Sequence, residues 1–193
     1  MERRHQAMRT VAVLLGLSVC AWLMGSPALA CDIETPEGYR LDHYRAPTPC
    51  ELPGARVANN EQMRVLVKDQ DAVLIDTTPL VHTTETDFTG RWTVPEPRDN
   101  IAGSVWLPNI GYGVLDDEMT GYFADNLERL TGSDPRRPLV FYCFVDCWMS
   151  WNAAKRALEF GYPNVVWYPD GTDGWKVIDG PFERATPVPL FEE

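Results

Sequence analysis

Two cysteines four positions apart, Cys143 and Cys147, are the residues of this sequence best suited to chemistry. They lie in FYCFVDCWMSW, where an apolar run ends at the first cysteine and a helix-like run follows the second. A cysteine held at the start of a helix loses its proton more easily, because unpaired N–H groups there favour negative charge. Cys143 is therefore a candidate nucleophile. An inert buried cysteine, or half of a structural disulfide, is the alternative.

The segments around the cysteines alternate between two kinds of apolar pattern. Four short apolar runs predict buried strands, at residues 72–76, 104–108, 138–143 and 164–168. Three stretches with apolar residues at helical spacing predict helices, at residues 59–70, 115–132 and 150–162. This alternation indicates an α/β fold with a mostly parallel central sheet and helices on both faces. Functional sites in such sheets lie at the carboxyl ends of strands, where Cys143 is expected.

The remaining segments lack sustained periodicity. Residues 31–58 are rich in proline and predict an extended segment that wraps over the domain, and residues 169–175 predict a glycine-rich turn. A long polar loop is expected between the first two strands. We therefore expect an N-terminal extension over residues 31–58, one domain over residues 59–185 and a tail over residues 186–193.

The first thirty residues read as a signal peptide. A basic start is followed by an uncharged apolar run of fifteen residues and by small residues at Ala28 and Ala30, which fit an Ala-x-Ala cleavage pattern. The apolar run is shorter than the roughly 20 residues of a membrane span. We therefore expect a periplasmic or otherwise exported protein without stable membrane insertion. A retained signal anchor is the alternative.

The chain is strongly acidic. Its formal net charge is −11, and loss of residues 1–30 would remove three Arg and one Glu, which brings the charge to −13. Such a surface repels nucleic acids and anionic lipids, so we expect no nucleic-acid partner. A basic protein partner would be favoured.

Four cysteines remain once Cys20 leaves with the signal peptide. In an oxidising compartment they are expected to pair, and three pairings are possible. Neighbourhood in the sequence favours Cys31 with Cys50, a bridge that would staple the extension, and leaves Cys143 and Cys147 for each other. The second bridge needs a loop that brings the two Cα atoms to roughly 4.4–6.8 Å.

Several segments, taken in order, resemble the rhodanese-like domain family. AVLID resembles its strand ending in Asp, and IAGSVWLP resembles its loop and following strand ending in Pro. PLVFYC, the cysteine loop and NAAKRALEFGYPNVVWYPDGTDGW resemble its active-site strand, loop, helix and Gly-x-x-x-Trp turn. The similarity covers roughly residues 62–177, and it implies the fold of that family.

The resemblance also implies a role for Cys143, which would accept a sulfane sulfur as a persulfide and pass it to a thiol or to cyanide. Asp76 would be the strand-end carboxylate, most often a structural hydrogen-bond acceptor. The active-site loop would cradle the sulfur with its backbone N–H groups, and it comprises Phe144, Val145, Asp146, Trp148 and Met149. Because this loop has no Lys or Arg and contains an aspartate, it is poorly suited to an anion such as thiosulfate or a phosphate ester.

The presence of Cys147 distinguishes this chain from a protein that only carries a persulfide. A thiol at Cys147 can attack a persulfide on Cys143, expel sulfide and close a disulfide. The pair therefore suits sulfur release or thiol–disulfide exchange, with Cys143 attacking and Cys147 resolving. A permanent structural disulfide would remove this chemistry. Whether the chain is an enzyme stays open, and no organic cofactor is expected.

A non-catalytic binding module, or a Cu(I)-handling protein, is the alternative function. Two thiolates with Met149 form a soft ligand set, and His43 or His82 could complete it. Such a site is the weaker interpretation, and our primary assignment includes no metal.

PEGYRLDHYRAPTP and YCFVDCWMSWNAAKRA resemble a narrower group, the exported rhodanese-like proteins with a Cys…Cys-Trp motif that are associated with alcohol catabolism by pyrroloquinoline-quinone (PQQ) dehydrogenases. The resemblance implies an accessory role in that system. The expected partners are a small sulfur donor or a protein thiol, and a PQQ dehydrogenase or its electron acceptor. Trp148 is the candidate for an exposed aromatic docking residue, and simple packing is the alternative.

Overall fold

Five parallel strands form the central sheet in a computed structural model that describes residues 32–69, 71–80, 86–87 and 89–191. Their order across the sheet is β1 (Arg56–Val57), β6 (Val165–Tyr168), β5 (Leu139–Tyr142), β2 (Val73–Asp76) and β4 (Ser104–Trp106). A separate antiparallel pair joins β3 (Asp99–Ile101) to β7 (Phe182–Arg184). β5 therefore lies at the centre of the sheet.

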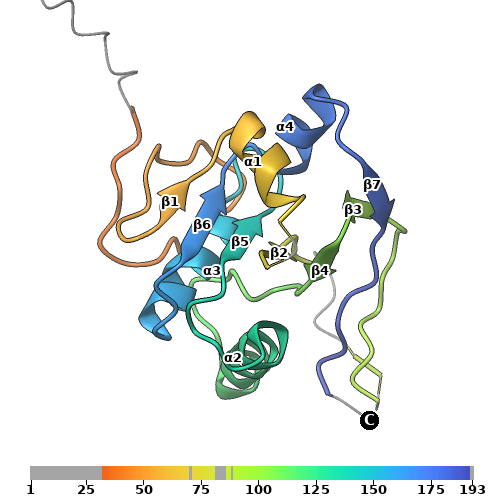
Figure 1. The fold of residues 1–193 in the computed structure, drawn as a ribbon. Coiled ribbons are helices and arrows are strands. Elements are labelled where there is room, and N and C mark those ends of the chain that lie inside the picture. Colours follow the sequence, from red (N-terminus) through yellow and green to blue (C-terminus); the bar gives the residue numbers. More distant parts are fainter. Residues whose placement is uncertain (1–31, 70, 81–85, 88, 192–193) are drawn as a thin grey trace, which may run out of the picture. The chain divides into compact units, whose positions relative to one another are not determined.

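Helices cover both faces of this sheet (Figure 1). In the described part of the chain they are α1 (Asn60–Leu66), α2 (Asp117–Thr131), α3 (Trp148–Glu159) and α4 (Gly171–Val177). Phe141 and Trp167 point to the face of α2 and α3, whereas Val140 and Tyr142 point to the face of α1 and α4. Because successive strand residues alternate between faces, each strand supplies both cores. The prediction of an α/β fold with a mostly parallel sheet is confirmed.

Short polar signals set the helix boundaries. Asn59 accepts a hydrogen bond from the Gln62 backbone N–H, and the Gln62 side chain accepts one from the Asn59 N–H. Asp116 caps α2 through the Met119 N–H, and Gly132 ends it with a left-handed φ of 64°. Two of the three predicted helices therefore begin at side chains that the sequence analysis could recognise.

The predicted turn at residues 169–175 is wrong, since α4 begins inside it. Gly171 has a φ of 52°, and the N–H of Thr172 donates to the carbonyl oxygen of Cys143 at 2.9 Å. A Cβ atom on Gly171 would lie 2.3 Å from that same oxygen. The absence of a side chain at Gly171 therefore allows the close approach of α4 to the end of β5.

The chain from residue 32 to β1 runs over α3 in an extended path. We call residues 39–51 the strap. The N–H of Arg40 donates to Oδ1 of Asn152 at 3.0 Å, and Nδ2 of Asn152 donates to the Arg40 and Gly111 carbonyl oxygens at 2.8 and 2.9 Å. Nε1 of Trp151 donates to the carbonyl oxygen of Glu51 at 3.1 Å. Side chains of α3 therefore satisfy the strap's backbone in place of a neighbouring strand.

The predicted signal peptide, residues 1–30, lies outside the described residues. Within the described ranges, no helix combines the length and the apolar character that crossing a membrane requires.

Gly171→Ala should destabilise the protein more than Gly132→Ala. Positive φ costs an alanine about 1 kcal/mol at either position. Only at Gly171 would the new methyl group also meet backbone, whereas nothing lies within 4 Å at Gly132. We expect losses of about 1 kcal/mol for Gly132→Ala and about 3 kcal/mol for Gly171→Ala in the free energy of unfolding, measured by denaturant titration. Equal losses would contradict the close packing of α4 against Cys143.

Candidate active site

Cys143 follows β5 directly, and Cys147 is the N-cap residue of α3. The two are joined by a disulfide, with their Cα atoms 6.1 Å apart. The expected position of Cys143, at the carboxyl end of a central strand, is thus observed. Cys147, however, occupies the helix start at which the sequence analysis placed Cys143, because α3 begins two residues before the predicted helix.

The disulfide is buried. Cys143 is 0% exposed and Cys147 is 2% exposed. With Met149 they form a small cluster, against which Tyr44, Tyr112 and Phe144 pack. An attacking thiol therefore reaches either sulfur only when part of this covering moves.

The strap supplies much of the covering, through two backbone hydrogen bonds to the cysteine loop. The N–H of Ala46 donates to the carbonyl oxygen of Asp146 at 3.1 Å, and the N–H of Trp148 donates to that of Tyr44 at 2.9 Å. Nε1 of Trp148 also donates to the carbonyl oxygen of Pro47 at 3.1 Å. Of the two interpretations of Trp148, simple packing is the one observed, because the strap satisfies its indole N–H and the residue is 2% exposed.

Two backbone N–H groups of the predicted sulfur cradle already have partners in this closed state. The N–H of Val145 donates to Oδ2 of Asp173 at 3.0 Å, and that of Trp148 is held by the strap. Asp146 adopts a left-handed φ of 53°, so the loop turns sharply between the cysteines. A sulfur cradle that used both N–H groups would therefore need the strap to release Trp148 and Asp173 of α4 to release Val145.

Two guanidinium groups from outside the loop flank Phe144. That of Arg45, in the strap, lies 4.7 Å from the ring centroid, and that of Arg98 lies 5.7 Å away. The sequence analysis missed both, because it sought a basic residue inside the loop. The surroundings of the loop are therefore more favourable to an anion than the loop sequence implies.

Asp76, at the end of β2, is completely buried and paired with Arg98, whose Nη1 lies 2.5 Å from Oδ2. Its other oxygen accepts the backbone N–H of Thr78 at 2.9 Å. Burial raises the pKa of the Asp76 carboxyl above its usual value, and the Arg98 charge and the Thr78 hydrogen bonds offset part of that rise. This geometry is that of a structural acceptor, which fixes the chain just beyond β2.

Thr78 is a site residue that the sequence analysis did not identify. Its Oγ1 donates to Sγ of Cys143 at 3.8 Å, within the reach of a hydrogen bond to sulfur. The neighbouring hydroxyl of Thr77 turns instead to the carbonyl oxygen of Tyr142, at 3.1 Å. The sequence shows two consecutive threonines, and no pattern in it distinguishes the one that meets the cysteine.

The other predicted ligands and bridges lie apart from this cluster or outside the described residues. Cys50 is disulfide-bonded, but Cys31 is outside the described residues, so their pairing stays a prediction. His82 is also outside them, and the side chain of His43 is 73% exposed. Among the side chains that the structure describes, no three His, Cys, Asp or Glu residues gather as metal ligands.

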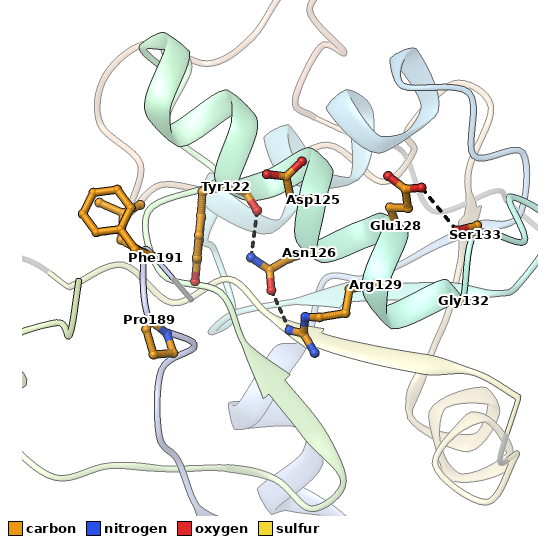
Figure 2. Close-up of a pocket in the computed structure, with 10 residues that line it drawn as sticks. Tyr122, Asp125, Asn126, Glu128, Arg129, Gly132, Ser133, Pro189 and Phe191 are labelled. Atoms are coloured by element: carbon orange, nitrogen blue, oxygen red, sulfur yellow. Dashed lines mark hydrogen bonds between the residues drawn. The ribbon is translucent and has the colours of Figure 1, made fainter. Parts of the chain in front are cut away.

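One sizeable cavity lies away from the cysteines. A groove of about 790 Å³ runs between α2 and the C-terminal segment (Figure 2), where Asn126 bridges the Tyr122 carbonyl oxygen and Arg129. A smaller cleft, of about 430 Å³, is lined by Val145 and Asp146 of the cysteine loop. The smaller cleft borders the cysteine loop, but neither Cys143 nor Cys147 lines it.

Comparisons with known proteins identify one family. A model described as the Rhodanese-like domain matches residues 59–177. No curated protein matches the chain.

Three solved structures illustrate the similarity at the level of coordinates. A thiosulfate sulfurtransferase from Pseudomonas aeruginosa is 17% identical with a TM-score of 0.46, over 69% of this chain and 22% of that chain. An uncharacterized protein from Saccharomyces cerevisiae is 21% identical with a TM-score of 0.40. The match covers 64% of this chain and 92% of the yeast protein. An anaerobic ergothioneine biosynthesis enzyme from Chlorobium limicola, in complex with trimethyl histidine, is 18% identical with a TM-score of 0.48. The match covers 71% of this chain and 33% of the Chlorobium protein. This chain thus spans less than a quarter of the Pseudomonas protein.

Arg98→Met should destabilise the protein at neutral pH by about 3 kcal/mol, because it leaves the Asp76 carboxylate buried without a counter-charge. Since burial raises the folded-state pKa of Asp76, acidification protonates this carboxyl in the folded protein before it does so in the unfolded chain. The loss should therefore shrink as the pH falls from about 7 towards about 4. Denaturant titrations at several pH values measure it, with Asp76→Asn/Arg98→Met as the control lacking this dependence. A loss that is independent of pH would contradict an ionised, buried Asp76.

Trp148→Phe should let a small thiol reduce the Cys143–Cys147 disulfide about fivefold faster, since the loss of one hydrogen bond of about 1 kcal/mol loosens the strap. Trp175→Phe is the matched control, because Nε1 of Trp175 donates to the Pro181 carbonyl oxygen and does not touch the strap. Quenched alkylation followed by mass spectrometry gives the rates. Equal acceleration in both variants would show that the strap does not limit access.

Proposed function

The chain belongs to the rhodanese-like domain family, and from that premise we propose that it performs sulfur transfer or thiol–disulfide exchange through Cys143 and Cys147. One observation carries the proposal: the two sulfur atoms are bonded to each other where β5 ends and α3 begins. That edge of a parallel sheet is where α/β folds place reactive groups. A disulfide at this position is suited to exchange with a thiol.

The reaction starts from the reduced pair. The Cys143 thiolate attacks the sulfane sulfur of a donor, whose leaving group departs with the bonding electrons, and a persulfide forms on Cys143. Cys147 then attacks Sγ of Cys143, its proton goes to the departing sulfide, and the disulfide closes. Two equivalents of an external thiol reduce the bond through a mixed disulfide and are themselves oxidised to a disulfide. Each cycle reduces one sulfane sulfur to hydrosulfide.

Thiol–disulfide exchange uses the same two atoms. Here Cys143 attacks a disulfide in a partner protein, a mixed disulfide forms, and Cys147 resolves it with release of the partner's thiol. Arg45 and Arg98 beside Phe144 favour an anionic donor or an acidic segment of a partner. Asp146 in the loop opposes this preference, so the identity of the donor is a matter for experiment.

The protein acts outside the cytoplasm in this proposal, as an accessory to PQQ-dependent alcohol oxidation. The signal-like pattern of residues 1–30 supports export. The resemblance to PQQ-associated proteins involves residues 36–49 and 142–157, and these segments bond to each other through Ala46 and Asp146. An exported chain that begins at Cys31 by mass spectrometry, and slower growth on alcohols after deletion of the gene, would support the two parts separately.

Copper handling is the second candidate, because Met149 lies in the same buried cluster as both cysteines. Once the disulfide is reduced, two thiolates and a thioether form a soft ligand set of the kind that Cu(I) prefers. Equilibrium dialysis of the reduced protein against Cu(I) tests this function. Binding lost in Cys143→Ser and in Cys147→Ala would favour it over sulfur transfer.

Cys147→Ala should stop the sulfur-transfer reaction at the persulfide. After reaction of the reduced variant with a sulfane donor, intact mass should rise by one sulfur atom located on Cys143, with no sulfide released. The unmutated protein should instead release one sulfide per chain and return to the disulfide. Cys143→Ser should do neither while it keeps its circular dichroism spectrum. A persulfide on Cys147, or no reaction with any sulfane donor or disulfide, would contradict the proposed roles.

A further inference from the structure

We propose that Thr78 is a catalytic residue of this site, whose hydroxyl stabilises the thiolate of Cys143 when the disulfide opens. The inference deepens the proposed function and rests on it for its biological meaning. Its starting point is the hydrogen bond from Oγ1 of Thr78 to Sγ of Cys143, at 3.8 Å, between two side chains that are 4% and 0% exposed.

The backbone of Thr78 is fixed on both sides. Its N–H donates to Oδ1 of Asp76 at 2.9 Å, and its carbonyl oxygen accepts Nε1 of Trp106 at 2.7 Å. Asp76 is held in turn by Arg98. Because threonine is branched at Cβ, few rotamers remain open to it once the backbone is fixed. The hydroxyl is therefore positioned before any reaction begins.

The interaction gains strength when the sulfur becomes charged. A disulfide sulfur is a weak acceptor, whereas a thiolate accepts a charge-assisted hydrogen bond. Burial by itself raises the pKa of a thiol, because it penalises the charged form. The Thr78 hydroxyl opposes that penalty and favours the thiolate that the proposed attack requires. It also favours the reduced pair over the disulfide.

Other groups that act on the Cys143 sulfur come from every element around it. Tyr44 and Tyr112 pack against the cluster from the strap and from the segment before α2. Charged groups near the loop are Arg45, Asp76, Arg98, Asp146, Asp170 and Asp173. All of them are retained when Thr78 is changed, but the Thr78 side chain also hydrogen-bonds the Asp76 carboxyl, so a substitution there acts on Cys143 both directly and through Asp76.

The test is the titration of the Cys143 thiol in a Cys147→Ala background, followed by the ultraviolet absorbance of the thiolate, which needs no access for a reagent. Thr78→Val removes the hydroxyl at nearly constant volume and should raise the pKa of Cys143 by about 1 pH unit. Thr78→Ser keeps the hydroxyl and should leave that pKa close to the parent value. Thr77→Val is the matched control, since its hydroxyl serves the Tyr142 carbonyl oxygen, and should also leave it unchanged.

A second readout uses the protein with both cysteines. At a pH above the pKa of Cys143 in both proteins, a pKa higher by 1 pH unit disfavours the reduced thiolate form tenfold, so Thr78→Val should make the disulfide harder to reduce by about 30 mV. If Thr78→Val does not fold, Thr78→Ala removes the same hydroxyl and should shift both readouts in the same direction. No shift in a folded variant, or an equal shift in Thr77→Val, would overturn the role of Thr78. Since neither measurement uses a sulfur donor, a shift without turnover would sink the proposed function and leave this inference standing.

Discussion

In the proposed function, backbone pairing between the strap and the cysteine loop controls whether the two sulfur atoms can react. The hydrogen bonds from Ala46 to Asp146 and from Trp148 to Tyr44 hold the strap over the cysteine loop at the carboxyl end of β5. A hydrogen bond of this kind contributes about 1 kcal/mol net, so a few of them can open locally while the domain stays folded. In the proposed function, such local opening admits a thiol to the otherwise buried disulfide.

The buried Asp76–Arg98 ion pair fixes the position of the chain that follows β2. Burying Asp76 and Arg98 is costly, and a buried ion pair is weak evidence for stability. What the pair provides is a fixed chain beyond β2, which brings Thr78 to Cys143. The strap, through the cysteine loop, and the polar pair, through Thr78, therefore both help to position the disulfide at the carboxyl end of β5.

The sequence was sufficient for those features that depend on nearby residues. Apolar runs located the central strands, apolar residues at helical spacing located α2, and the order of motifs placed Cys143 after its strand. The features that the sequence did not predict depend on contacts between segments that are distant in the sequence. The local sequence does not show that the strap covers Trp148. Nor does it show that Gly171 belongs to a helix that lies close to the end of β5.

The cations and the threonine near the loop were missed for the same reason. Arg45 and Arg98 reach Phe144 from the strap and from the long loop, and only tertiary packing brings them to one ring. The most direct measurement is the reduction potential of the Cys143–Cys147 pair in the folded protein, from alkylation and intact mass in graded thiol–disulfide buffers. The account predicts reversible opening above about −300 mV with the secondary structure retained. A bond that stays closed at that potential, and opens only when the protein unfolds, would be structural and would contradict the account.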